Sequence, residues 1–181
     1  MKSEANKLLV STVKKLIHRR GMAQLEKIIA RAPPADLAYV FNFLTKQERV
    51  EFFAAFGDHA ELAAGMLPEV EPPVLTDFLN ELGERKILAM LELMSPDDAA
   101  DVLELIDDEE RKELILTMMH REEFVTTQSL LEFDPESAGG LMVPDFFALN
   151  EFTTARDAIQ QLQEDAGRTE VVFYLYVINE H

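Results

Sequence analysis

The sequence predicts a mainly α-helical protein, in which a solenoid-like stack of helix pairs precedes an incomplete α/β segment. Three observations support this prediction. Apolar residues recur at three- and four-residue spacing from about residue 5 to residue 132. A weak internal repeat relates residues 34–40 to residues 96–102. Beyond residue 140 the pattern changes to short apolar runs that are typical of strands.

Proline and small polar residues divide the helical part into short elements. Leu9, Val13 and Ile17 illustrate the apolar spacing that places residues on one helix face. Breaks occur at Pro33-Pro34, where one helix ends and the next begins, and again at Ser95-Pro96. We therefore expect successive helices joined by tight connections.

The internal repeat extends beyond one helix. Residues 34–40 align with residues 96–102 without a gap, and the same offset pairs Glu48-Arg49 with Glu110-Arg111. Residues 72–93 read as a degenerate copy between the two. Helix pairs that bury their apolar faces only by stacking indicate an α-solenoid. An irregular helical bundle is the alternative.

The last forty residues differ from the rest. Gly139-Gly140 ends the helical pattern, and residues 146–149 predict a strand. Thr153 or Thr154 then caps a helix, and residues 171–178, β-branched and aromatic throughout, predict a buried strand. One such strand does not complete a sheet. We therefore expect the chain to be a piece of a longer protein, with this strand disordered or paired with another chain.

The composition limits the classes of function. The net charge is −17 and there is no cysteine, which excludes disulfides and thiolate chemistry. No apolar stretch approaches the ~18 residues that cross a bilayer. A surface this acidic repels phosphate backbones, so we expect no nucleic-acid partner, and it attracts cations. Acidic helix surfaces that only confer solubility are the plainer explanation.

The first 31 residues carry the opposite charge. They contain eight of the seventeen Lys and Arg residues but only two of the thirty-four Asp and Glu residues. Lys14-Lys15 and Arg19-Arg20 belong to an amphipathic pattern that could contact an acidic membrane surface or the acidic body of a partner subunit. A first solenoid helix with a solvated basic side is the interpretation that we favour.

Two aspartates are candidate ligands for a cation. Asp97 and Asp101 lie four residues apart on a predicted helix, so they share a face with about 6 Å between their Cβ atoms. Like charges at this spacing cost a helix about 0.2–0.5 kcal/mol, which a bound cation would remove. Magnesium prefers one or two carboxylates and several waters. Glu104 and Asp108 continue the acidic face if the helix runs that far.

The same residues also have a structural explanation. Ser95 is a natural N-cap, Pro96 suits the first helical position, and Asp98 completes a pattern that resembles a capping box. An aspartate in the first turn also complements the helix dipole, which accounts for Asp97 without a metal. We assign Asp98 to capping, and the spacing alone leaves Asp97 and Asp101 open between the two interpretations.

Signatures of catalysis are missing from the sequence. The four histidines, His18, His59, His120 and His181, show no metal-ligand spacing and are expected at the surface. No serine lies in a nucleophile-elbow pattern, and no glycine-rich loop could cradle a phosphate. We therefore expect that the protein is not an enzyme.

Three segments carry a resemblance to a known family. Ser137-Ala138-Gly139-Gly140-Leu141-Met142 resembles the linker between the helical N domain and the first CBS domain of MgtE magnesium channels. Tyr174-Leu175-Tyr176-Val177-Ile178 resembles the strand that follows the first CBS helix, and residues 95–101 resemble a helix start in the N domain. The resemblance covers roughly residues 30–181. It implies a right-handed α-superhelix over residues 1–133, a linker over 134–144 and an incomplete CBS domain over 145–181.

The resemblance also implies a function. The chain would be a magnesium-sensing regulatory region at the cytoplasmic face of a membrane, with the rest of the CBS pair and a dimeric transmembrane pore as partners. The family's N-domain magnesium ligands fall on Asp97 and Asp101. A further acidic ligand would align with Gly65, which has no side chain to offer, and Glu61 lies one turn earlier. We therefore expect weak Mg²⁺ binding in this chain. The alternative is an acidic helical-repeat scaffold that binds a protein partner without a metal.

Overall fold

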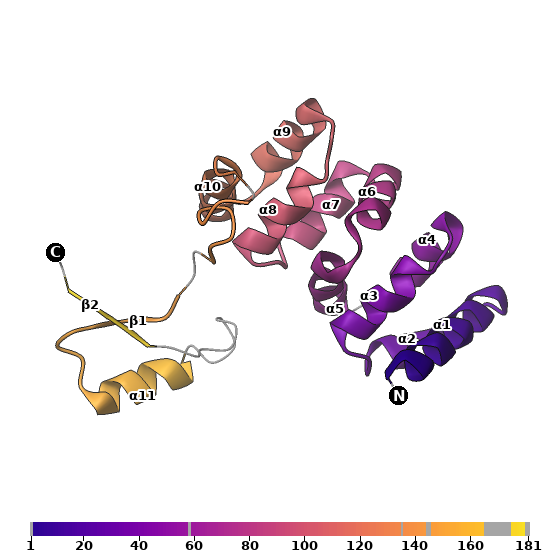
Figure 1. Cartoon of the computed structure of the whole chain (residues 1–181), viewed down its shortest axis with the longest axis horizontal. Coiled ribbons are helices and arrows are strands. Elements are labelled where there is room, and N and C mark those ends of the chain that lie inside the picture. The colour runs from indigo at the N-terminus through magenta and orange to yellow at the C-terminus, as the bar shows by residue number, and fades with distance from the viewer. Residues whose placement is uncertain (1, 58, 135, 144–145, 165–174, 180–181) are drawn as a thin grey trace. The chain divides into compact units, whose positions relative to one another are not determined.

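A computed structural model describes the chain except for residues 1, 58, 135, 144–145, 165–174 and 180–181. The chain forms two compact units, Met1–Gly140 and Leu141–His181, and each is described by itself. The described residues form eleven α-helices, a 3₁₀-helix and two short strands (Figure 1). Their bounds are α1 Lys2–His18, α2 Met22–Ile29, α3 Pro34–Asn42, α4 Lys46–Ala54, α5 Ala60–Met66, η1 Leu67–Glu69, α6 Pro72–Glu81, α7 Glu84–Leu91, α8 Pro96–Glu104, α9 Glu109–Met118, α10 Arg121–Leu131, β1 Ala148–Asn150, α11 Ala155–Glu164 and β2 Tyr176–Ile178. The predicted mainly α fold is confirmed.

The helices of the first unit stack in alternation. Helix α1 contacts α3, and the row continues through α5 and α7 to α9. Helices α4 and α6 contact each other in the same manner, as do α8 and α10. Most of these helices thus meet the helix two positions along the chain, which is the arrangement expected for stacked helix pairs.

Helix starts follow from local sequence. Proline occupies the first helical position of α3, α6 and α8, where its missing N–H is not needed. At α4 the Thr45 hydroxyl accepts from the N–H of Glu48 while the Glu48 carboxylate accepts from the N–H of Thr45. This reciprocal capping box satisfies two backbone donors that the helix leaves unpaired.

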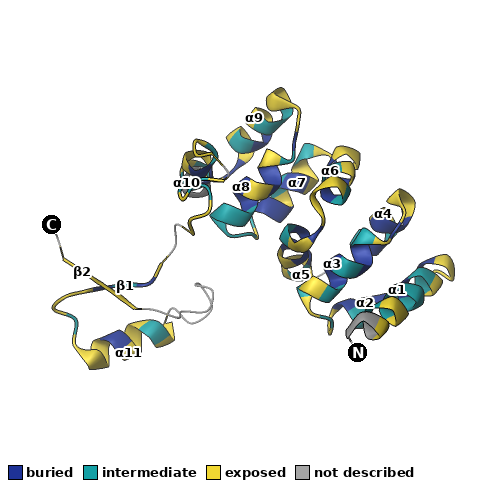
Figure 2. Cartoon of the chain, viewed as in Figure 1, coloured by how far each residue is buried: buried dark blue, intermediate teal, exposed yellow. Residues whose placement is uncertain are grey.

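One continuous apolar core runs through the first unit. It begins at Val13 in α1 and ends at Met119 after α9, and its members are almost fully buried. Figure 2 shows buried and exposed residues alternating along individual helices, as amphipathic packing requires. Phe41 lies in this core with its ring against those of Phe52 and Phe78.

Two arginines at equivalent repeat positions donate hydrogen bonds to carbonyl oxygens near helix C-termini. The Arg49 Nε donates to the carbonyl oxygen of Phe41 at 3.4 Å. Arg111 donates to the carbonyl oxygens of Leu79 and Leu82 at the end of α6, and its Nε lies 3.1 Å from Glu84 Oε1. The Glu48-Arg49 and Glu110-Arg111 repeat in the sequence therefore marks a shared device, in which an arginine satisfies carbonyls at a helix C-terminus.

The second unit is small. Strands β1 and β2 pair in parallel, with Ala148 opposite Tyr176. Helix α11 begins after Thr154, whose hydroxyl accepts from the N–H of Asp157, so Thr154 is the cap of the two threonines considered. The buried cluster here consists of Phe147, Leu149 and Ala158, with Leu162 packed against it.

Some local expectations prove wrong. The predicted strand 171–178 falls partly outside the described residues, and its described part, β2, is exposed along its whole length rather than buried. The strand expected at 146–149 begins two residues later, at Ala148. The predicted domain limits stay a prediction, although the two units divide within the expected linker.

Candidate functional site

Helix α8 presents the candidate metal ligands. Its buried residues Ala99, Val102 and Leu103 face the core, and the helix contacts α10 and η1. Ser95 is the N-cap residue and Pro96 follows it, as expected, but the Ser95 side chain makes no capping hydrogen bond. The capping-box interpretation of this helix start is therefore wrong on the Ser95 side.

Asp97 and Asp101 lie together on the part of α8 that faces away from the core. Asp97 is half-buried, and its Oδ1 is buried without a hydrogen-bond partner. Partial burial raises the pKa of Asp101 above its ordinary value, and the charge of Asp97 raises it further. Among the described residues, no basic side chain counts among the causes that shift the pKa of Asp101.

Glu104 extends this acidic face, and Asp108 does not. Burial raises the pKa of Glu104 and the charge of Asp101 adds to the effect, while Lys112 opposes it and Asp134 reinforces it. Helix α8 ends at Glu104. Asp108 is instead the N-cap of α9, where its carboxylate accepts from the N–H of Arg111 at 3.1 Å. Asp108 was expected on the face only if the helix ran that far, and this condition is not met because α8 ends four residues earlier.

Two acidic side chains elsewhere in the first unit, Glu48 and Glu84, have lowered pKa values instead of raised ones. Burial alone would raise the pKa of Glu48, but hydrogen bonds from Thr45 and the charges of Lys14 and His18 outweigh it and lower the pKa. The pKa of Glu84 is also lowered, by its own backbone N–H and by Arg111. Both carboxylates have partners, so the uncompensated charge on α8 is a local feature.

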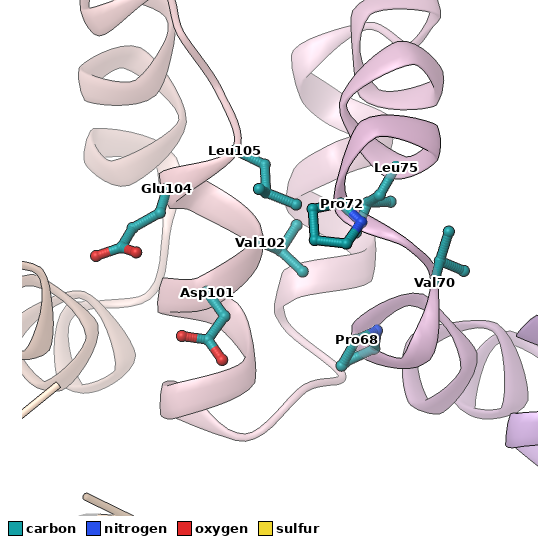
Figure 3. A pocket seen from close by; sticks show the side chains of 8 residues that line it. All are labelled: Pro68, Val70, Pro72, Leu75, Asp101, Val102, Glu104 and Leu105. Atoms are coloured by element: carbon teal, nitrogen blue, oxygen red, sulfur yellow. The ribbon is translucent and has the colours of Figure 1, made fainter. Parts of the chain in front are cut away.

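A small pocket lies beside Asp101. It has a volume of about 240 Å³. In Figure 3, Val102 and Leu105 point from α8 toward Pro72, while Asp101 and Glu104 leave the helix on another side. The full lining is Pro68, Val70, Pro72, Leu75, Asp101, Val102, Glu104 and Leu105. Because pockets for organic ligands are commonly about 300–1,000 Å³, this one is small for such a ligand.

The donor set fits a hydrated magnesium ion in part. Within the described residues no group of three His, Cys, Asp or Glu side chains could hold a metal. Two carboxylates are nevertheless the usual protein contribution for Mg²⁺, which keeps several waters. The unpartnered Asp97 Oδ1 is the atom that a cation would satisfy.

Other sequence candidates fall as follows. Gly65 and Glu61 are both exposed on α5, and a Cβ at Gly65 would meet only Pro34 Cγ, at 3.8 Å. His18 and His120 lie near Glu48 and Glu92 at the surface. Exposed His59 agrees with expectation, and His181 lies outside the described residues.

Sequence reasoning missed the pocket and the contribution of Asp134 to the acidic face. Asp134 follows α10, thirty residues beyond Glu104, and no pattern in the sequence relates the two. The pocket depends on the turn at Pro68 and Pro72 meeting α8.

None of the helices in the described part of the chain is long and apolar enough to cross a membrane.

Comparisons with known proteins agree with this fold. A model of the MgtE intracellular N domain matches residues 32–136, more than half of the chain. The magnesium transporter MgtE of Bacillus subtilis (strain 168) is 28% identical over 165 residues, covering 91% of this chain and 36% of the relative. The magnesium transporter MgtE of Thermus thermophilus is 26% identical over 161 residues, covering 86% of this chain and 35% of the relative. The chain thus spans about a third of the length of these relatives.

Two solved structures share the fold. A crystal structure of the soluble part of a magnesium transporter has a TM-score of 0.83 at 21% identity, and covers 97% of this chain and 68% of that one. The cytosolic domain of the Mg²⁺ channel MgtE in complex with ATP has a TM-score of 0.84 at 22% identity, and covers 94% and 69%. On the strength of the match over residues 32–136, the chain belongs to the MgtE intracellular N domain family.

Proposed function

We propose that this chain is the magnesium-sensing regulatory region of a magnesium transporter, and that Asp97 and Asp101 bind the ion. The observation that carries the proposal is the uncompensated pair itself. Asp97 Oδ1 is buried without a partner, and the pKa of Asp101 is raised by burial and by Asp97. A divalent cation would satisfy the orphan oxygen and replace repulsion between the two carboxylates with attraction to the ion.

Regulation follows from a difference in affinity between two arrangements. Two carboxylates leave most of the coordination sphere of Mg²⁺ to water or to oxygens from other parts of the protein. An ion that bridges α8 to such oxygens binds a compact arrangement better than an open one. It therefore shifts the population toward the compact, closed state. When the magnesium concentration falls, repulsion among the carboxylates that have lost the ion favours the open arrangement.

The relatives support the setting of this proposal. Both matched relatives are described as magnesium transporters, so we place the chain in a transporter at the cytoplasmic face of a membrane. We further propose that it acts as a homodimer with the remaining CBS and pore domains, and that it has no catalytic role. Magnesium is both the transported ion and the regulator.

Thermal unfolding against magnesium chloride tests the site. Ionic strength is held constant with sodium chloride, and unfolding is followed by circular dichroism. With a dissociation constant on the order of 1 mM, 10 mM magnesium stabilises the folded state by about 1.4 kcal/mol through mass action. Asp97→Asn/Asp101→Asn should abolish this gain. Asp36→Asn/Glu51→Gln, which removes two charges from the first repeat copy, should retain it.

The competing function is a scaffold that binds a basic protein partner through its acidic surface. A scaffold responds to total ionic strength and not to magnesium as such. Equal midpoints in magnesium and sodium at matched ionic strength would favour the scaffold. A magnesium response that survives in Asp97→Asn/Asp101→Asn would place the ion elsewhere in the protein.

A further inference from the structure

The first two helices form a basic surface on an otherwise acidic protein. Residues 1–31 contain eight of the seventeen Lys and Arg residues and only Glu4 and Glu26 as acids. This surface lies outside residues 32–136, which the family model matches. Its exposed basic members, called the basic face below, are Lys7, Lys15, Arg19, Arg20, Lys27 and Arg31.

The buried residues and the basic residues of helix α1 lie on opposite sides of the helix. Val13 and Ile17 are buried in the core. Since each residue turns a helix by about 100°, Lys7, Lys15 and Arg19 fall within an arc of about 120° on the opposite side. The helix is therefore packed on one side and basic on the other.

An exposed leucine lies within the basic arc. Leu8 falls between Lys7 and Arg19 around the helix, and 68% of its surface is exposed. Helices that lie in a membrane interface combine Lys and Arg on a polar face with apolar residues such as leucine.

The end of α1 keeps an arginine at a strained position. Arg20 has a φ of 55°, in the left-handed region where glycine is favoured. It follows the last turn of α1, and its N–H donates to the carbonyl oxygen of Ile17 at 2.9 Å. Glycine at this place would remove the steric cost. The chain instead carries an exposed cation, which adds to the charge of the basic face.

No ion pair in the described part of the chain involves the basic face, although exposed Glu4 lies within its arc on α1. The ion pairs of lysine and arginine in the described part of the chain are Lys46 with Asp77, Arg111 with Glu84 and Lys112 with Glu109. None involves the basic face. Its charges are therefore open to an external anion.

We propose that the basic face binds the anionic surface of a lipid bilayer, with Leu8 inserted at the headgroup level. The acidic remainder of the protein does not prevent this binding, because salt screens charges that lie more than about 8–10 Å from the surface. A bilayer is favoured over other polyanions because it offers exposed Leu8 an apolar phase as well as anionic groups. The proposal also rests on the proposed function, which sets the chain in a membrane transporter.

Vesicle sedimentation tests this proposal on the chain as it is. The probes are phosphatidylcholine vesicles and vesicles with about one-third phosphatidylglycerol, at low salt and at high salt. Each basic side chain near an anionic surface contributes roughly fivefold to partitioning. Lys7→Gln/Lys15→Gln/Arg19→Gln should therefore lower binding to the anionic vesicles by about a hundredfold, and Leu8→Gln should lower it further.

The matched control is Lys46→Gln/Arg85→Gln/Lys86→Gln, which also removes three exposed positive charges. It should bind the anionic vesicles as the wild type does, and circular dichroism should show all variants folded. Equal losses in the two triple variants would overturn the proposal. So would equal binding to phosphatidylcholine, equally tight binding to single-stranded RNA, or self-association in sedimentation equilibrium that the first triple variant abolishes.

Discussion

The two clean repeat copies use the same framework differently. Helices α3 and α8 both begin with proline at the first position and an aspartate in the first turn. At the three outward positions of the acidic face their residues differ: α8 has Asp97, Asp101 and Glu104, whereas α3 has Ala35, Tyr39 and Asn42. The framework does not require charge at these places, since the first copy folds without it.

The first copy uses these positions for structure. Tyr39 packs its ring against Phe43, with 4.9 Å between centroids, and Asn42 Oδ1 accepts from the N–H of Glu71 at 3.1 Å. In the second copy, Asp97 Oδ1 has no such partner in the described structure. The acidic residues of α8 are therefore not part of what the repeat needs to fold. Residues that the framework does not need are where a ligand site is expected.

The largest expected difference between the copies concerns their arginines. Arg111→Met should lower the free energy of unfolding by about 2–3 kcal/mol, because it leaves two carbonyls and Glu84 without their donor. Arg49→Met should cost about 1 kcal/mol, because it removes one long hydrogen bond and a contact with the Phe41 ring. Urea unfolding followed by circular dichroism measures both. Equal costs would mean that the two arginines have the same structural role.

A smaller effect is expected at the third helix of each copy. Thr127 in α10 is fully buried and its hydroxyl has no partner, whereas the equivalent position in α5 is Gly65, which is open. Thr127→Val should raise the free energy of unfolding by about 1 kcal/mol, because it removes an unsatisfied polar group at nearly constant volume. Thr117→Val serves as the control: its exposed hydroxyl donates to the carbonyl oxygen of Leu114, so no gain is expected. A loss at Thr127 would indicate that the hydroxyl has a partner in solution.

The smallest expected effect is a pH-dependent change in stability, which should have opposite sign at Asp101, whose pKa is raised, and at Glu48, whose pKa is lowered. The folded-state pKa of Asp101 is raised, so its charge destabilises the fold at neutral pH and the penalty fades as pH falls toward 3.8. Asp101→Asn should therefore stabilise by about 0.2–0.5 kcal/mol at pH 7 without magnesium, and the gain should vanish near pH 4. The pKa of Glu48 is lowered, so its contribution is present above 4.5 and is lost as pH falls through the folded-state pKa.

Glu48→Gln should accordingly destabilise at pH 7 and have little effect in acid. Thermal midpoints measured from pH 7 to pH 3 give both difference curves. Curves of the same sign for the two variants would contradict the contrast between a compensated and an uncompensated carboxylate.

The sequence predicted the elements that depend on local signals. Proline at the first helical position, the apolar spacing and the Thr154 cap all act within a few residues, so α3, α8 and α11 start where expected. The pairing of Asp97 with Asp101 also follows from helix geometry alone. Whether they bind magnesium stays a prediction.

Features that depend on distant contacts could not be predicted. The charge of Asp134 raises the pKa of Glu104 because α10 packs on α8. The pocket forms where the turn before α6 meets α8. Asp108 leaves the acidic face for a local reason: α8 ends at Glu104, and Asp108 is the N-cap residue of α9.

The unbroken core of the first unit has a mechanical consequence. Packed interiors resist compression and transmit strain, and this one runs from Val13 to Met119 without interruption. A displacement at α8 is therefore passed on through contiguous packed side chains toward α1, and is not absorbed at a joint between helix pairs.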